Sequence, residues 1–251
     1  MTMAVLTAEE FVRRALDIAD HYKTLYVMGC FGAPMNAANK ARYCQNDPYN
    51  RQGARTKMIL AASEDTFGFD CAGLIKAILW GWSGDKSKVY GGAVYKSNGM
   101  ADIGANTMIA QAKKAKASQW EELAPGDLLW SKDHIGIYVG GGLAAECTPA
   151  WKNCVQITAV GNLDGIPGGY PVRKWSKHGK NPWVDYGADV LAKGSRVRLR
   201  PAARTYNGKA LAPWVYTVSF EVLQLTGDRA VIGLGGAVTA AVRAEDLILE
   251  R

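Results

Sequence analysis

The sequence has few of the residues that build metal or redox centres. Its 251 residues include three histidines and five cysteines, and no two cysteines form a C-x-x-C pair. That spacing argues against a zinc ribbon, and the odd number leaves at least one thiol outside any complete disulfide scheme. A reduced state during synthesis is the simplest interpretation. Whether Cys147 and Cys154 pair is left open by the sequence.

Long apolar runs and clustered charges are absent as well. No stretch reaches the roughly 20 apolar residues of a membrane span. Residues 1–16 show no basic region followed by a long apolar core, so we expect neither membrane insertion nor a signal peptide. The net charge of +7 is spread along the chain, so it does not form a nucleic-acid-binding tail. The charge favours an anionic polymer, which by charge alone is a nucleic acid, an acidic lipid surface or a bacterial wall, and a solvated basic surface explains it equally well. Of these partners we expect the bacterial wall and no nucleic acid.

Helical periodicity dominates the first half of the chain. Residues 7–23 begin with Thr7 and carry Glu10 three positions later, which is the capping box of a helix start. Further helices are expected over 71–82 and within 101–117. The polar segment 33–66 is expected to form a long loop with at most one short helix.

From residue 125 the period changes to that of strands. "PGDLLW", "HIGIYVGGGLAAEC" and "VQITAV" are expected to be successive strands, with another extended element near residue 183. After residue 188 a new series begins with "RVRLR", "YTVSFEVLQL", "RAVIGL" and "VTAAV". We therefore predict an α+β domain over 1–187 and a small all-β domain over 188–251.

The stretch "GFDCAGLIKAI" raises a question about Cys71. Asp70 is a natural N-cap, and an apolar face would direct the thiol inward; it is formed by Cys71, Leu74, Ile75, Ile78, Leu79 and Trp82. A helix N-terminus favours a thiolate, and its free N–H groups can stabilise an oxyanion. A structural cysteine at a capped helix start has the same sequence, so this stretch alone does not decide.

A base for such a thiol is found among three histidines. His21 lies near the end of the first helix and His178 in a turn-like polar stretch, whereas His134 opens a predicted hairpin. With a turn centred on Gly140, His134 lies opposite Glu146 on the polar face, and Gly136 leaves room for another element or a substrate. A carboxylate there orients the imidazole as in a triad. An exposed ion pair on an ordinary hairpin is the alternative, and a one-residue slip would separate the pair.

The ordered set "YVMGC", "FDCAGLI", "PGDLLW" and "HIGIYVGGG" resembles the NlpC family of papain-like cysteine peptidases, which cut peptides of bacterial peptidoglycan. The resemblance covers residues 26–150 and implies a papain-like fold without metal or cofactor. Met28 and Cys30 stand where the family motif has Trp and Gly, and the segment 31–68 is much longer than usual. This insertion is expected to border the cleft and to tune the choice of substrate.

The resemblance also implies roles for individual residues. Cys71 falls on the nucleophile, His134 on the general base and Glu146 on the orienting position. Tyr26 falls on the aromatic residue near the oxyanion, and Asp70 falls on an acidic position that meets the substrate's amine in some relatives.

The C-terminal segment resembles the small Src-homology-type β-barrels with which bacterial and phage wall hydrolases hold the cell wall. Tyr206, Trp214 and Tyr216 are the expected wall-binding residues, together with Phe220, and filling the barrel core is the alternative role for about half of them.

Together these features predict a peptidoglycan hydrolase that cleaves an amide bond in the stem peptide, as a bacteriophage endolysin does. An endopeptidase after D-glutamate is favoured over an N-acetylmuramoyl-L-alanine amidase. An acyltransferase on the same fold and a non-catalytic wall-binding protein are the other readings. The enzyme would be made in the bacterial cytoplasm and would reach the wall through phage lysis or with a phage tail. The sequence does not indicate an oligomeric state.

Overall fold

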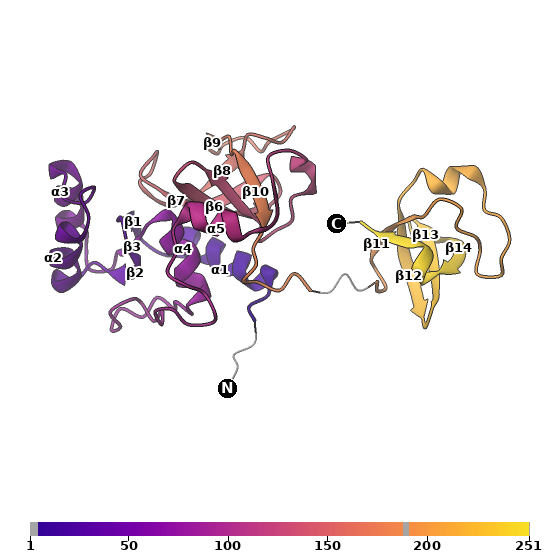
Figure 1. Ribbon diagram of the computed structural model, residues 1–251, viewed down its shortest axis with the longest axis horizontal. Coiled ribbons are helices and arrows are strands. Elements are labelled where there is room, and N and C mark those ends of the chain that lie inside the picture. Colours follow the sequence, from indigo (N-terminus) through magenta and orange to yellow (C-terminus); the bar gives the residue numbers. More distant parts are fainter. Residues whose placement is uncertain (1–4, 188–190, 251) are drawn as a thin grey trace. The chain divides into compact units, whose positions relative to one another are not determined.

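The computed structural model describes residues 5–187 and 191–250. The chain forms two compact units, Met1–Tyr186 and Gly187–Arg251, and each has a hydrophobic core of its own. The first unit mixes helices with sheets, and the second consists of strands and short 3-10 turns (Figure 1). The described part of the chain contains no helix that is long and apolar enough to cross a membrane.

Two capped helices contribute to the core of the first unit, α1 through one buried face and α4 along its whole length. Helix α1 (Ala8–His21) begins where the Thr7 hydroxyl accepts a hydrogen bond from the Glu10 N–H, as the capping box predicts. The Glu10 carboxylate turns instead to Arg13 and Arg14. Helix α4 (Cys71–Leu79) begins at Asp70, whose side chain accepts from the Gly73 N–H. Every residue of α4 is buried, because α1 and the central strands pack around it.

A seven-stranded sheet forms the second half of this unit. Its order is β4-β10-β5-β6-β7-β8-β9, and all pairs are antiparallel except β8 with β9. The strands are β4 (Lys113–Lys116), β5 (Leu128–Ser131), β6 (His134–Gly140), β7 (Leu143–Thr148), β8 (Cys154–Val160), β9 (Val172–Arg173) and β10 (Lys177–Lys180). Helix α4 packs against β6 and β7, so the start of α4 and the start of β6 belong to one core.

The long segment after Cys30 is more ordered than its polar composition predicted. It contains helices α2 (Ala37–Asn46) and α3 (Gly53–Ala61), which pack on each other. They lie beyond a small sheet of order β1-β3-β2, formed by β1 (Thr24–Tyr26), β2 (Phe31–Pro34) and β3 (Phe67–Phe69) (Figure 1). The predicted loop is therefore wrong. The Asn36 side chain caps α2 by accepting from the Asn39 N–H.

Two other predicted elements differ from the structure. Helix α5 covers only Ala105–Gln111, and the lysine-rich end of the predicted helix is strand β4, which pairs with β10. The extended element predicted near residue 183 is β10, which ends at Lys180. Strand pairing outweighed helical propensity in the lysine-rich stretch because its exposed side chains impose no helical face of their own.

The second unit is a five-stranded antiparallel sheet around a small core. Its order is β14-β13-β12-β11-β15, with β11 (Arg196–Leu199), β12 (Phe220–Thr226), β13 (Arg229–Leu234), β14 (Ala237–Arg243) and β15 (Leu247–Leu249). The first four match the predicted strands, and β15 was not anticipated. A 3-10 turn over Pro213–Tyr216 contributes Val215 to the core, alongside Phe220.

Candidate active site

The structure places His134 and Glu146 in direct contact. His134 Nε2 lies 2.6 Å from Glu146 Oε2, so the two side chains share a face of the β6–β7 hairpin, as predicted. The side chain of Glu146 is fully buried, and that of His134 is 15% exposed. The pair is therefore internal and is not the exposed surface pair that was the alternative reading.

The register of this hairpin differs from the predicted one by two residues. Ile137 pairs with Ala145, and Tyr138 with Ala144, so continuing the ladder brings Gly136, rather than His134, opposite Glu146. His134 reaches Glu146 along a diagonal. The turn lies later than predicted, at Gly141 and Gly142, because Gly140 pairs with Leu143, and the register is irregular between Tyr138 and Gly140. A shift of two residues preserves the faces of both strands, which is why the contact survives.

Glu146 binds more than its histidine. Its carboxylate accepts hydrogen bonds from Thr158 Oγ1 at 2.6 Å and from Arg173 Nε at 2.8–2.9 Å. Burial opposes ionisation of this carboxyl group, but the hydrogen bonds and charges of His134 and Arg173 outweigh burial and lower the pKa of Glu146. Glu146 is therefore an anion at neutral pH.

Trp175 occupies the space beside Gly136. A Cβ on Gly136 would lie 2.7 Å from Trp175 Cη2, so only glycine lets the indole approach so closely. The ring stacks on His134 with centroids 5.5 Å apart and an interplanar angle of 11°. The bare position predicted beside His134 thus receives another element of the protein, and that element fixes the plane of the imidazole.

Cys71 lies at the N-terminus of α4, directed toward the start of β6. Its Sγ lies 4.0 Å from the carbonyl oxygen of Asp133, the residue before His134, and the backbone N–H of Ile135 also acts on the sulfur. Because Nε2 of His134 is engaged by Glu146, Nδ1 is the imidazole nitrogen that this contact leaves available. Cys71 is 7% exposed.

The resting form of Cys71 differs from the expected thiolate. Burial and the negative charge of Asp70 raise the pKa of the Cys71 thiol to about 12, against the opposing effect of the backbone amides of Ile135, Ala72 and Cys71 itself. The helix N-terminus is present, but desolvation outweighs it. A thiol in this setting needs a base to remove its proton when it reacts.

Tyr26 and Asp70 flank the thiol. Burial, followed by the charges of Cys71 and Asp70, raises the pKa of Tyr26 well above its usual range, so its hydroxyl stays protonated and can donate. Asp70 is buried, and its carboxylate accepts from the backbone N–H groups of Gly73 and Gly29. Asp70 therefore caps helix α4 and holds the loop at Gly29. Its contact with a substrate amine stays a prediction.

The insertion helices brace the segment that carries Tyr26. Arg55 of α3 donates to the Tyr26 carbonyl oxygen and, at 2.7 Å, to Asn153 Oδ1 in the β7–β8 loop. Asn50 accepts from the Met28 N–H and donates to the Met28 carbonyl oxygen. The insertion was expected to border the cleft; the observed contacts show that it holds the backbone beneath a site residue.

The remaining histidines and cysteines are engaged elsewhere. His21 Nδ1 lies 3.1 Å from Asp17, and His178 is buried in β10 with Nε2 bonded to the Ser118 carbonyl, not in a turn. All five cysteines are free. Cys147 and Cys154 do lie on adjacent strands, but Cys154 pairs with Thr148 and Cys147 with Val155, so the two thiols face opposite sides of the sheet.

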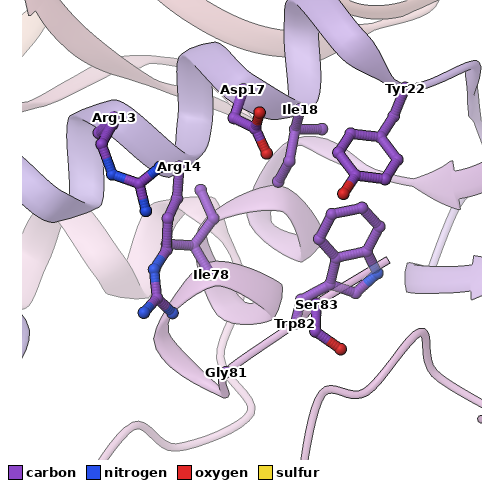
Figure 2. A pocket seen from close by; sticks show the side chains of 9 residues that line it. All are labelled: Arg13, Arg14, Asp17, Ile18, Tyr22, Ile78, Gly81, Trp82 and Ser83. Atoms are coloured by element: carbon purple, nitrogen blue, oxygen red, sulfur yellow. The ribbon is translucent and has the colours of Figure 1, made fainter. Parts of the chain in front are cut away.

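A separate cavity of about 280 Å³ lies between α1 and the end of α4. Figure 2 shows Arg13, Arg14 and Asp17 at one side and the Tyr22 and Trp82 rings at the other. It is lined by none of Cys71, His134 and Glu146. Its two arginines are already paired with Glu10.

The second unit has a cavity of about 570 Å³ around Tyr206. The Tyr206 ring has the guanidinium groups of Arg229 and Arg243 within 6 Å of its centre, and Arg204 also lines the cavity. Of the other predicted wall-binding residues, Trp214 is half exposed. The Tyr216 hydroxyl donates to the Ala203 carbonyl oxygen, and the ring packs on the core.

Sequence reasoning missed Thr158, Arg173, Trp175 and Arg55 as parts of the site. Thr158 of β8 and Arg173 of β9 contact Glu146, Trp175 of the β9–β10 link stacks on His134, and Arg55 of the insertion binds the Tyr26 carbonyl. These residues are far apart in the sequence, so only the fold brings them together. Within the described residues, no group of three or more histidine, cysteine or acidic side chains could hold a metal ion. No family model matches the chain, and no curated protein matches it.

Proposed function

We propose that the chain is a peptidoglycan hydrolase that cleaves an amide bond of the stem peptide with Cys71 as nucleophile, in a papain-like arrangement. The observation that supports this most is the buried His134–Glu146 pair, which lies at the start of β6 where the Cys71 thiol is directed. The geometry supports acyl transfer by a thiol. The substrate class follows from the sequence resemblance, as does the wider proposal of an endolysin-like enzyme.

The proposed reaction begins with a neutral thiol. His134 Nδ1 takes the proton of Cys71 as the sulfur attacks the scissile carbonyl, and Glu146 stabilises the imidazolium. The N–H groups at the start of α4 and the Tyr26 hydroxyl stabilise the oxyanion. His134 then gives its proton to the leaving amine, so that the C–N bond breaks and a thioester remains. His134 next accepts a proton from the water that attacks the thioester. It then returns this proton to the departing sulfur, so that the C–S bond breaks and the acid and the Cys71 thiol are released.

Purified peptidoglycan tests this proposal. Released muropeptides are identified by mass spectrometry, which shows whether the new amine comes from an endopeptidase or an amidase cut. We expect release by the wild type and by Cys44→Ala, the matched control on α2, and none by Cys71→Ala. Transfer of the acyl group to an added amine, without hydrolysis, would support the acyltransferase reading. Wild-type inactivity, or activity in Cys71→Ala, would refute the mechanism.

For the second unit we propose a small wall-binding barrel whose cavity at Tyr206 takes an anionic wall polymer. Support comes from Arg229 and Arg243, whose guanidinium groups lie against the half-buried Tyr206 ring, and from Arg204, which lines the same cavity. Guanidinium groups bind phosphate and carboxylate well, and such binding weakens with salt.

Co-sedimentation with cell walls tests the binding proposal in the Cys71→Ala background. We expect the double substitution Arg204→Gln and Arg243→Gln to reduce binding and its salt dependence. Arg196→Gln with Arg198→Gln removes the same charge from β11 and is the control. Equal loss in both double variants would show that overall charge, not the cavity, carries the binding.

A further inference from the structure

Arg173 is the second cation on the buried carboxylate of Glu146. Its Nε lies 2.9 Å from Oε1 and 2.8 Å from Oε2 of Glu146, and its Nη2 donates to Thr148 Oγ1 at 3.2 Å. Glu146 itself has no exposed surface. A buried carboxylate needs compensation by charge and hydrogen bonds, and Arg173 supplies both.

Aromatic rings hold the guanidinium of Arg173 in place. Its centre lies 4.9 Å from the Trp151 ring and 5.5 Å from the Trp175 ring, and Trp175 also stacks on His134. Trp151 adopts a positive φ of 53°, a strained conformation for so large a side chain. The β7–β8 loop keeps Trp151 there through the bond from the Asn153 N–H to the Ala150 carbonyl and from Gln156 to the same oxygen.

The two cations around Glu146 differ in one respect that matters for the reaction. His134 gains and loses a proton during each proposed turnover, whereas a guanidinium stays charged at all working pH values. When His134 is neutral, Arg173 is the remaining cation bonded to Glu146. Without it, a buried carboxylate would face a neutral imidazole and would compete with that imidazole for the proton.

We propose that Arg173 is a positioning residue that keeps Glu146 anionic and fixed through the whole cycle, so that the proton taken from Cys71 stays on His134 until the leaving amine receives it. This inference rests on the proposed function for its catalytic meaning. The electrostatic part concerns the resting protein and can be measured without any substrate.

The surroundings of Glu146 allow a clean test. The charged or titratable groups that act on it most are His134 from β6 and Arg173 from β9. Strand β8 presents Thr158 and the paired Gln156, neither of which titrates. Removing Arg173 therefore removes one positive charge that opposes protonation of both Glu146 and His134.

The experiment compares Arg173→Met and Arg173→Lys with the wild type, after circular dichroism has shown that each is folded. Glu146 is followed by carbon NMR of its side-chain carboxyl group, assigned with Glu146→Gln. We expect its titration to move to higher pH by about 1–3 units in Arg173→Met and much less in Arg173→Lys, which keeps the charge. Arg14→Met, which removes an arginine from Glu10 on α1, is the control and should leave Glu146 unchanged.

Kinetics supply the second readout. In Arg173→Met, kcat/KM at the optimum should fall by about 10- to 100-fold, and the acidic limb of its pH profile should move to higher pH. In a Glu146→Gln background, Arg173→Met should move that limb less, because only the direct effect of the arginine charge on His134 remains. A purely structural role would lower the rate at every pH without moving the limb.

The outcomes separate this proposal from the proposed function. An unmoved Glu146 titration in Arg173→Met overturns the role of Arg173, whatever the activity. If Arg173→Met does not fold, Arg173→Gln takes its place, because it keeps a hydrogen-bond donor and removes the charge: an unmoved Glu146 titration in that variant would likewise overturn the role of Arg173. If the Glu146 titration shifts in Arg173→Met but the wild type shows no hydrolase activity, the proposed reaction is refuted, while the electrostatic role of Arg173 at Glu146 is supported.

Discussion

Alkylation of Cys71, the proposed nucleophile, should show that its side chain is a neutral thiol when no substrate is bound. Burial and Asp70 raise its pKa to about 12, so at pH 7 roughly a thousandfold less thiolate is present than for an ordinary thiol of pKa near 9. Because the thiolate is the species that reacts with iodoacetamide, the rate at Cys71 should rise about tenfold per pH unit between pH 7 and pH 10 without a plateau.

Mass spectrometry of peptides from the alkylated protein measures this rate. Cys44 is less buried than Cys71 and provides an internal reference in the same sample. Burial also slows access of the reagent, so the shape of the pH profile, and not the absolute rate, carries the conclusion. Asp70→Asn should increase the rate at pH 8, since it removes the negative charge that opposes ionisation of Cys71.

A plateau below pH 8 would refute this reasoning. It would mean that Cys71 exists as a thiolate beside a protonated His134 before any substrate arrives. His134 would then act first as an acid toward the leaving amine, and the general-base step would be absent from the proposed reaction.

Three further predictions concern the frame of the site. Arg55→Met should lower the free energy of unfolding in urea by about 1–3 kcal/mol, because buried backbone and side-chain acceptors lose a charged donor; unchanged stability would contradict the bracing role of the insertion. Gly136→Ala should cost about 1–3 kcal/mol by pushing the Trp175 ring, whereas Gly168→Ala, which meets no atom within 4 Å, should cost little. Glu146 has a lowered pKa in the folded protein, so its share of the stability is present above its unfolded pKa and is lost as the pH falls through the folded pKa; Glu146→Gln should flatten this acidic loss in thermal melts.

Short sequence patterns correctly predicted the helix starts and the strand that follow from residues close together in the chain. The capping box at Thr7, the N-cap at Asp70 and the alternation after His134 each involve neighbours within a few residues, and each led to the right element. The hairpin register failed because three consecutive glycines permit turns of several widths. Successive side chains of a strand point to alternate faces of the sheet, so an error of two residues leaves each side chain on its predicted face. His134 and Glu146 therefore still share a face.

The rest of the site depends on pairings that no local pattern encodes. Arg173 reaches Glu146 because β9 joins the sheet beside β8 in parallel, after a long irregular link. Arg55 looked like one more polar residue of a loop, since helices α2 and α3 lack a strong apolar stripe. The raised pKa of Cys71 could not be anticipated either, because it depends on how deeply α4 is buried.

The sequence distances between the contacting groups have a consequence for folding. His134 and Glu146 are 12 residues apart on one hairpin, whereas Cys71 meets Asp133 across 62 residues and Arg55 meets Asn153 across 98. Contacts that close long loops form late because the chain entropy must be spent before they contribute. His134 and Glu146 can therefore meet early, whereas Cys71 and the Arg55 contacts under Tyr26 reach their places only with the last tertiary contacts. A half-folded chain would carry the His134–Glu146 pair without the Cys71 thiol beside it.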